Sequence, residues 1–226
     1  MRTHPLDCPA WSALTSRQSA FGVGGAQARR FRENIGPFAA AADNSPEAVA
    51  ALAALAHADD DMSLLEVAPP APPLGIQLKL NALGVQMTTK DFAAGGSNFP
   101  MDALSDADSA EMIALAALTK PGPFRAATHT LGRFVGIRDN GKLIAMAGER
   151  LQTPEFIEVS AVCTHPDYRG RGYGAALMST VGARIIADGA TPFLHSYADN
   201  TTAIALYKSL GFEQRCEVIH AVWARA

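Results

Sequence analysis

The order of strand and helix patterns between residues 133 and 223 constrains the fold more than any other feature of the sequence. Two β-patterned runs, Arg133 to Ile137 and Leu143 to Arg150, flank Asp139-Asn140-Gly141, and Asn-Gly supplies the positive φ angles of a tight hairpin turn. The patterns that follow predict a strand, a helix, a strand, a helix and a strand, at residues 156–164, 172–188, 193–197, 200–210 and 216–223. A hairpin followed by alternating helices and strands predicts the α/β fold class, with a mixed (α+β) sheet covered by helices.

A short strand and a helix are predicted ahead of this hairpin. Phe99 to Leu104 is strand-like, and Ser105-Asp106-Ala107-Asp108 resembles a capping box that opens a helix. That helix places Met112, Leu115 and Ala116 on one face and stops before Pro121-Gly122-Pro123.

The first 96 residues are less regular. Ser45-Pro46-Glu47 predicts the start of a helix, and strands are predicted for 62–67, 76–80 and 83–88. The small and flexible residues Ala93 to Asn98 form the clearest linker signal. We therefore expect an N-terminal α/β region at 1–96 and a second domain at 97–226. The N-terminal region could shape an acceptor pocket, form a degenerate half of the same fold, or mediate dimerisation.

Composition excludes several classes of protein. The 226 residues are 48% hydrophobic and 18% charged, which provides a sizeable core and is incompatible with a disordered chain. A net charge of -3 gives no general attraction to nucleic acid or to an anionic membrane. The longest apolar run, Ala48 to Ala56, is far shorter than the roughly 20 residues that a membrane-spanning helix needs. Cys8, Cys163 and Cys216 are too few and too scattered for a disulfide framework or a metal site, so we expect a cytoplasmic protein without a metal.

A glycine-rich loop joins a predicted strand to a predicted helix and is expected to bind an anion. In Arg169-Gly170-Arg171-Gly172-Tyr173-Gly174-Ala175 the glycines allow the backbone N–H groups to approach a ligand, and the following helix adds its positive end. The Gly-Lys-Ser/Thr of a nucleotide-binding P-loop is absent. Gly170-x-Gly172-x-x-Ala175 fits a dinucleotide fingerprint, but about 50 residues follow it, too few for the domain that such a fingerprint opens.

Two segments resemble the GNAT superfamily of N-acetyltransferases. Arg169-x-x-Gly172-x-Gly174, preceded by the segment Val162 to Tyr168, resembles the family's acyl-CoA-binding motif. The second segment, residues 200–212, resembles the family's N-x-x-A-x-x-x-Y-x-x-x-G-F helix. The matching positions are Asn200, Ala203, Tyr207, Gly211 and Phe212. The resemblance covers about residues 97–226, and the segment Phe193 to Trp223 is similar to the glycine-N-acyltransferase-like branch.

The resemblance implies a GNAT-like fold in which two neighbouring strands splay apart around acetyl-CoA, the acyl donor. It implies that Asn200 contacts the pantetheine arm and that Tyr207 lies near the thioester sulfur and protonates the departing thiolate. The implied main-chain contacts with the donor come from Val162, Cys163 and Thr164 for pantetheine, and from Arg169, Gly170, Arg171, Gly172, Tyr173, Gly174 and Ala175 for the pyrophosphate.

Transfer to an amine also requires the loss of a proton. Glu158 stands where several members of the family carry a glutamate that acts as a base, directly or through water, and burial in a cleft could raise its pKa toward a useful range. Water alone is the rival. Strand alternation predicts that Phe156, Glu158, Ser160 and Val162 share one face and that Ile157, Val159 and Ala161 share the other.

Four other side chains are weaker candidates for chemistry. Cys163 is expected on the face opposite Glu158 as a core residue, and His195 as a structural histidine. Glu149 and Arg150 are expected at a solvated strand end, with substrate contact as the alternative.

The sequence therefore predicts an acetyl-CoA-dependent N-acetyltransferase that transfers an acyl group to a primary amine, a small molecule or an amino acid, within a ternary complex. The alternatives are a non-catalytic acyl-CoA-binding sensor and a protein N-acetyltransferase. A homodimer is compatible with the sequence.

Overall fold

The computed structural model describes residues 4–89, 92 and 99–226. Its helices are α1 Pro9–Leu14, α2 Pro46–Ala54, α3 Ser109–Thr119, α4 Tyr173–Ala187 and α5 Thr201–Ser209. Its strands are β1 Gly22–Gly24, β2 Ala28–Phe31, β3 Ala39–Ala41, β4 Met62–Glu66, β5 Ile76–Thr88, β6 Asp102–Leu104, β7 Phe134–Asp139, β8 Lys142–Gln152, β9 Phe156–Thr164, β10 Thr191–Tyr197 and β11 Glu213–Arg225.

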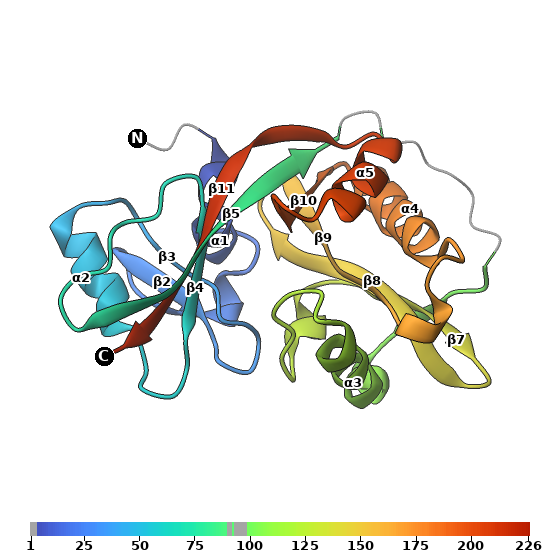
Figure 1. Ribbon diagram of the computed structural model, residues 1–226. Coiled ribbons are helices and arrows are strands. Elements are labelled where there is room, and N and C mark those ends of the chain that lie inside the picture. The colour runs from blue at the N-terminus through green and yellow to red at the C-terminus, as the bar shows by residue number, and fades with distance from the viewer. Residues whose placement is uncertain (1–3, 90–91, 93–98) are drawn as a thin grey trace.

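One mixed sheet runs through the whole molecule. Within the described residues, its eight strands lie in the order β4-β11-β5-β10-β9-β8-β7-β6, and β1, β2 and β3 form a separate small sheet. The long strands β5 and β11 connect the N-terminal half to the half that carries α3, α4 and α5 (Figure 1). The α/β fold class with a mixed sheet is confirmed.

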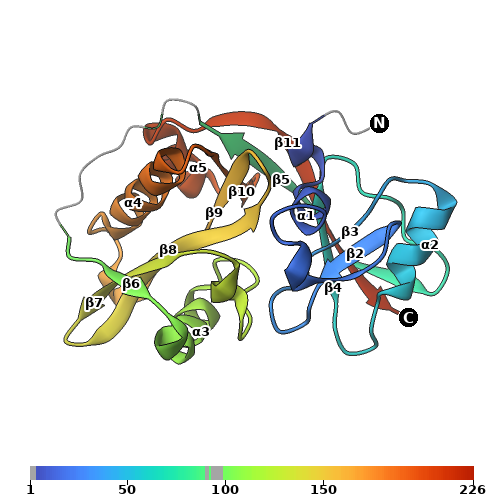
Figure 2. The ribbon, with the colours of Figure 1, turned by 180° about the vertical axis from the view of Figure 1, so that it is seen from behind.

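Helices cover both faces of the C-terminal half of the sheet. Leu177, Val181 and Ile185 of α4 are buried against β8, β9 and β10 on one face. Met112 and Leu115 of α3 are buried on the other face, which the view from behind shows (Figure 2). Both stripes follow helical spacing, so these helices pack as the sequence predicts.

Local signals place the turns and helix starts correctly. Asn140 and Gly141 adopt positive φ angles of 49° and 82° between β7 and β8. The side chains of Ser45 and Asn200 cap α2 and α5 by accepting hydrogen bonds from backbone N–H groups three residues ahead. The capping box at Ser105 forms as predicted. Side-chain caps depend on nearby residues only, so sequence reveals them well.

The N-terminal region contributes two strands to the main sheet. The runs predicted at 76–80 and 83–88 form one strand, β5, because residues 81 and 82 keep their pairing with β11. Strand β4 pairs with the opposite edge of β11. Most of the predicted linker at 93–98 lies outside the described residues, so the division at residue 97 stays a prediction, although the main sheet contains strands from both sides of it.

A β-bulge in β9 changes the predicted alternation. Met146 pairs with Cys163 and Gly148 with Ser160, so Ala161 and Val162 together oppose Ala147. Ala161 has a φ of +53°, unusual for a residue other than glycine.

The bulge moves side chains to the opposite face. Ile157 and Val159 lie in the α4 core, whereas Ala161 and Cys163 lie in the α3 core. Three predictions are therefore wrong: that Ala161 shares a face with Ile157 and Val159, that Val162 shares a face with Glu158, and that Cys163 lies on the face opposite Glu158.

Among the described residues, none of the helices combines the length and the apolar character needed to cross a membrane.

Candidate active site

Strands β9 and β10 are parallel neighbours that separate part-way along their length. Their pairing covers Thr191 to Phe193 against Phe156 to Glu158 and then ends. A small cavity, partly open to solvent, occupies the space beyond. Its lining includes Pro121, Arg150, Glu158, Val159, Ser160, Ala161, Val162, Met178, Leu194, His195 and Tyr207. The sheet is thus opened where the sequence resemblance implies two splayed strands.

The glycine-rich loop lies between the end of β9 and the start of α4. Gly170 and Gly172 have φ angles of 76° and 86°, and a Cβ atom on either would meet no atom within 4 Å. Gly172 is the N-cap of α4, and Ala176 donates the first backbone hydrogen bond of the helix back to it. Within the described part of the chain, the backbone N–H groups from residue 170 to residue 175 have no hydrogen-bond partner, so they are available to an anion.

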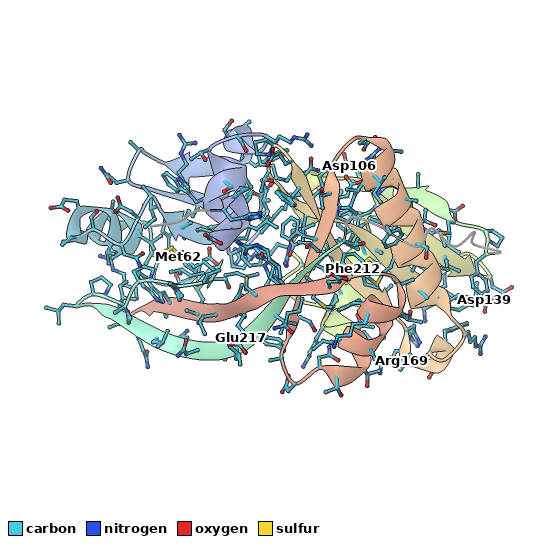
Figure 3. The ribbon with its side chains drawn as sticks, turned by 90° about the horizontal axis from the view of Figure 1, so that it is seen from above. Met62, Asp106, Asp139, Arg169, Phe212 and Glu217 are labelled. Atoms are coloured by element: carbon cyan, nitrogen blue, oxygen red, sulfur yellow. The ribbon has the colours of Figure 1, made fainter. Side chains whose placement is uncertain are left out.

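Two arginines flank this loop. The Arg171 guanidinium lies 5.0 Å from the ring centroid of Tyr168, and Arg169 Nε lies 3.4 Å from the carbonyl oxygen of Thr164. Figure 3 shows Arg169 on the half of the molecule that holds α4 and α5, far from Met62 of β4. Both side chains are exposed, so their charge is available to a ligand at the loop.

Tyr207 projects from α5 into the cavity lining. It packs against the α4 core, and its ring centroid lies 6.4 Å from that of Phe212. Burial raises the pKa of its phenol above the ordinary value of 10.0, so the hydroxyl keeps its proton at neutral pH. Asn200, in contrast, is exposed, and its Oδ1 accepts a hydrogen bond from Ala203 N at 3.3 Å. It caps the helix and lies outside the cavity lining.

Glu158 is fully buried at the closed end of the cavity. Arg150 donates to it twice, from Nη2 to Oε1 at 2.7 Å and from Nε to Oε2 at 2.8 Å. His195 Nδ1 lies 2.7 Å from Oε1, and Leu151 N donates to Oε2 at 3.3 Å. These four donors fill the roughly four acceptor positions of a carboxylate.

The electrostatic balance at Glu158 follows from these contacts. Burial acts to raise its pKa, but the charge and hydrogen bonds of Arg150 together with the bond from His195 outweigh burial and lower the pKa to about 2. The shift is opposite to the upward shift expected from the sequence, because sequence alone could not show a buried arginine paired with this carboxylate.

A chain of hydrogen bonds continues from His195 to the N-terminal segment. Gln86 Nε2 lies 2.9 Å from His195 Nε2 and donates to the carbonyl oxygen of Leu6 at 2.9 Å. Arg215 donates to Gln86 Oε1 at 2.9 Å and also pairs with Asp7. Because Arg215 fixes the orientation of the Gln86 amide, His195 accepts at Nε2 and donates from Nδ1 to Glu158.

Glu149, Arg150 and Cys163 are all buried in the neighbouring strands β8 and β9. Glu149 and Arg150 do not lie at a solvated strand end: β8 continues to Gln152, and both side chains are buried. Glu149 faces away from the cavity and pairs with Arg133 and Arg184. Cys163 is a core residue as expected, and burial raises the pKa of its thiol to about 11, which makes it a poor nucleophile.

Gln86 and Arg215 carry no local signal of a role at this site. They lie 109 and 20 residues from His195 in the sequence, and only the pairing of β5 with β10 and β11 brings them together. Among the described residues, no group of three or more His, Cys, Asp or Glu side chains is arranged to hold a metal ion.

Comparison with known proteins agrees with this geometry. Residues 134–224 match the model of the family described as FR47-like protein. A solved structure from Novosphingobium aromaticivorans, assigned to the GNAT family of acetyltransferases, is 43% identical with a TM-score of 0.92, and the alignment covers 99% of both chains. A GCN5-related N-acetyltransferase from Kribbella flavida is 19% identical with a TM-score of 0.66 over 93% of both chains, which shows the shared fold.

Two curated relatives match shorter stretches. N-alpha-acetyltransferase RimI of Mycobacterium tuberculosis is 39% identical over 84 residues, 36% of this chain and 52% of that protein. Mycothiol acetyltransferase of Corynebacterium aurimucosum is 41% identical over 75 residues, 33% of this chain and 24% of that protein. The matches thus span about half or less of the length of these curated relatives.

The fold and the opened sheet define a protein of the acetyltransferase class. The near-complete alignment with the Novosphingobium structure then fixes the family: this chain belongs to the GNAT family of acetyltransferases.

Proposed function

We propose that this protein is an acetyl-CoA-dependent N-acetyltransferase that transfers an acetyl group to a primary amine within a ternary complex. The observation that carries the proposal is the separation of β9 from β10 after Glu158 and Phe193, with Tyr207 lining the resulting cavity. The glycine-rich loop, with its unpartnered N–H groups, follows β9 directly.

The residues present fit acetyl-CoA as the acyl donor. The main-chain groups of Val162, Cys163 and Thr164 lie on the β9 segment beyond its pairing with β10, where they can pair with the pantetheine amides. The loop N–H groups and the start of α4 can hold the pyrophosphate, and the open space at Gly170 and Gly172 admits its oxygens. Acetyl-CoA supplies an activated carbonyl and a thiolate leaving group.

Tyr207 is assigned to protonate the departing thiolate. Its hydroxyl is protonated at neutral pH because burial raises the pKa, and it belongs to the cavity lining. Asn200 is assigned a contact with the pantetheine arm through atoms that its capping bond leaves free.

For the amine proton, we assign water as the acceptor rather than Glu158. The Glu158 carboxylate has four donors and a pKa of about 2, so it has neither a free position nor the basicity to take a proton from an ammonium group. We assign Glu158 the role of positioning Arg150 and His195.

The decisive experiment measures release of CoA thiol from acetyl-CoA across a panel of amines, together with acetyl-CoA affinity by calorimetry. Amine-dependent thiol release supports the enzyme. Binding of acetyl-CoA without release in the presence of any amine would instead support the non-catalytic sensor.

A second candidate acceptor is the N-terminus of a protein, favoured by the match to N-alpha-acetyltransferase RimI over 84 residues. Peptides with a free N-terminal amine belong in the panel for this reason. The proposed placement in the glycine-N-acyltransferase-like branch rests on the sequence of residues 193–223, and glycine as an acceptor tests it directly.

A further inference from the structure

One side chain of the cavity has an unused donor edge. Arg150 is 8% exposed and uses Nε and Nη2 for Glu158. Within the described part of the chain, its Nη1 has no hydrogen-bond partner. A Cβ atom on Gly122 would lie 3.7 Å from Nη1, which places this nitrogen beside Pro121 and Gly122, at the part of the cavity lining formed by the loop after α3.

The guanidinium is held rigidly. Glu158 fixes one edge through two parallel hydrogen bonds, and the guanidinium carbon lies 4.5 Å from the centroid of the Phe38 ring. A charged fork that is already ordered loses little conformational entropy when it binds a ligand.

From this arrangement we infer that the cavity recognises an acceptor amine that also carries a carboxylate, and that Arg150 Nη1 binds the carboxylate. This inference rests on the proposed function and names its substrate class. An arginine that serves two carboxylates has a parallel in this chain, because Arg133 pairs with both Glu149 and Asp188.

The other side chains of the cavity suit the amine of such an acceptor. Glu158 is the sole acidic residue in the described lining, and its acceptor positions are filled. The acceptor ammonium therefore gains no ion pair that would stabilise its charged form, while the carboxylate provides the anchor. Transfer requires the uncharged amine, so a site that binds the carboxylate and leaves the ammonium unpaired favours reaction.

The test compares an α-amino acid with its own amide at a pH above the pKa of both amines, so that both acceptors are present as the uncharged amine. For the unmodified protein, an α-amino acid is expected to exceed its own amide in kcat/KM by about 30-fold, the weight of one hydrogen bond between charged groups. Arg150→Lys is expected to bring that ratio close to one, because lysine provides a single ammonium for Glu158 and leaves no second edge. Arg32→Lys, at an exposed position in the N-terminal half, is the matched control and keeps the ratio.

The ratio stays informative if Arg150→Lys lowers activity toward both acceptors, and acetyl-CoA affinity by calorimetry shows whether the variant is folded. If the variant fails to fold, the ratio of kcat/KM for the amino acid to that for its amide, measured on the unmodified protein, supports or overturns the inference by itself. Equal use of acid and amide overturns the inference and leaves the proposed function standing, whereas absence of thiol release with every acceptor overturns the proposed function itself.

Discussion

Phe193 of β10 faces Glu158 of β9 in the last parallel pair that joins these two strands. Both side chains are fully buried, and His195, two residues beyond Phe193, approaches the same carboxylate that Arg150 of β8 holds. Three neighbouring strands are therefore tied together at one carboxylate, immediately before the sheet opens. The position of the cleft is fixed by this polar contact as well as by packing.

Tyr207→Phe tests whether Tyr207 is the acid that protonates the departing thiolate. Turnover is expected to fall by about 100-fold, because the thiolate then leaves without a positioned proton donor. Acetyl-CoA affinity is expected to stay within about threefold, since phenylalanine preserves the packing of the ring. Steady-state kinetics and calorimetry measure the two quantities. Tyr197→Phe, which removes an exposed hydroxyl that contacts His220, is the control. Unchanged turnover in Tyr207→Phe would show that the acid is another group.

Gly172→Ala tests the anion-binding loop. Alanine at a φ of +86° costs about 1 kcal/mol of folding stability, and its Cβ atom occupies the open space that a phosphate would enter. CoA affinity is expected to fall at least about tenfold, measured by calorimetry. Gly75→Ala is a matched control, because Gly75 also has a positive φ, +84°, and open space around it. The control variant is expected to lose the same stability but to keep its affinity for CoA. An equal fall in affinity in both variants would show that the loop does not bind the CoA phosphates.

The sequence predicted those parts of the fold that depend on neighbouring residues. The hairpin turn at Asn140-Gly141, the helix start at Ser45 and the capping box at Ser105 all follow from local backbone and capping preferences. The helix stripes on α3 and α4 follow from periodicity.

The parts that the sequence missed depend on distant residues or on strain. Nothing local marks alanine as the residue for a φ of +53°, so the bulge at Ala161 and the change of face that follows it were not foreseeable. The Arg150 pair that lowers the pKa of Glu158 and the bond from Gln86 to His195 arise only when separate strands meet. The loop and Tyr207 could be read from motifs, but the charge state of Glu158 could not.

A fragment that begins at residue 97 tests whether the predicted second domain is independent. Strand β11 takes its partners from β4 on one edge and β5 on the other, and both belong to the N-terminal region. The fragment is expected to lack a cooperative thermal transition in circular dichroism, because 13 residues of β11 would have both edges unpaired. Co-expression of residues 1–96 with residues 97–226 is expected to restore the transition. A cooperative transition in the fragment alone would establish an independent domain.

Glu158→Gln separates a positioning role from a base. The variant leaves the buried Arg150 without its counter-charge, so the free energy of unfolding near neutral pH is expected to fall by about 3 kcal/mol. The folded-state pKa of about 2 lies below the ordinary 4.5, so the stability that Glu158 provides is present above about pH 4.5 and is lost as the pH falls toward 2. Guanidinium unfolding at several pH values measures both effects. In the variant, the loss of unfolding free energy between about pH 4.5 and 2 that is due to Glu158 is expected to be absent.

The pH–rate profile of the same variant addresses the chemistry. Because the carboxylate is ionised throughout the neutral range, the variant is expected to keep the inflection points of kcat/KM between about pH 6 and 9, although the rate falls. Glu155→Gln, an exposed acid next to β9, is the control. Loss of an inflection in Glu158→Gln alone would restore Glu158 as the base.

His220 of β11 gives the fold a second dependence on pH. Burial, with smaller effects from the positive charge of Arg150 and from His195, lowers the pKa of its imidazole from 6.5 to about 4. Below about pH 6.5 the unfolded chain binds a proton at this residue that the folded chain does not, so the free energy of unfolding decreases as the pH falls from 6.5 to 4 and is then independent of this group. The decrease is on the order of 2 kcal/mol once partial exposure is allowed for. His220→Gln is expected to remove it in guanidinium unfolding at about pH 7, 5.5 and 4. His57→Gln changes an exposed histidine and is expected to leave the decrease in place; the same pH dependence in both variants would exclude His220 as its source.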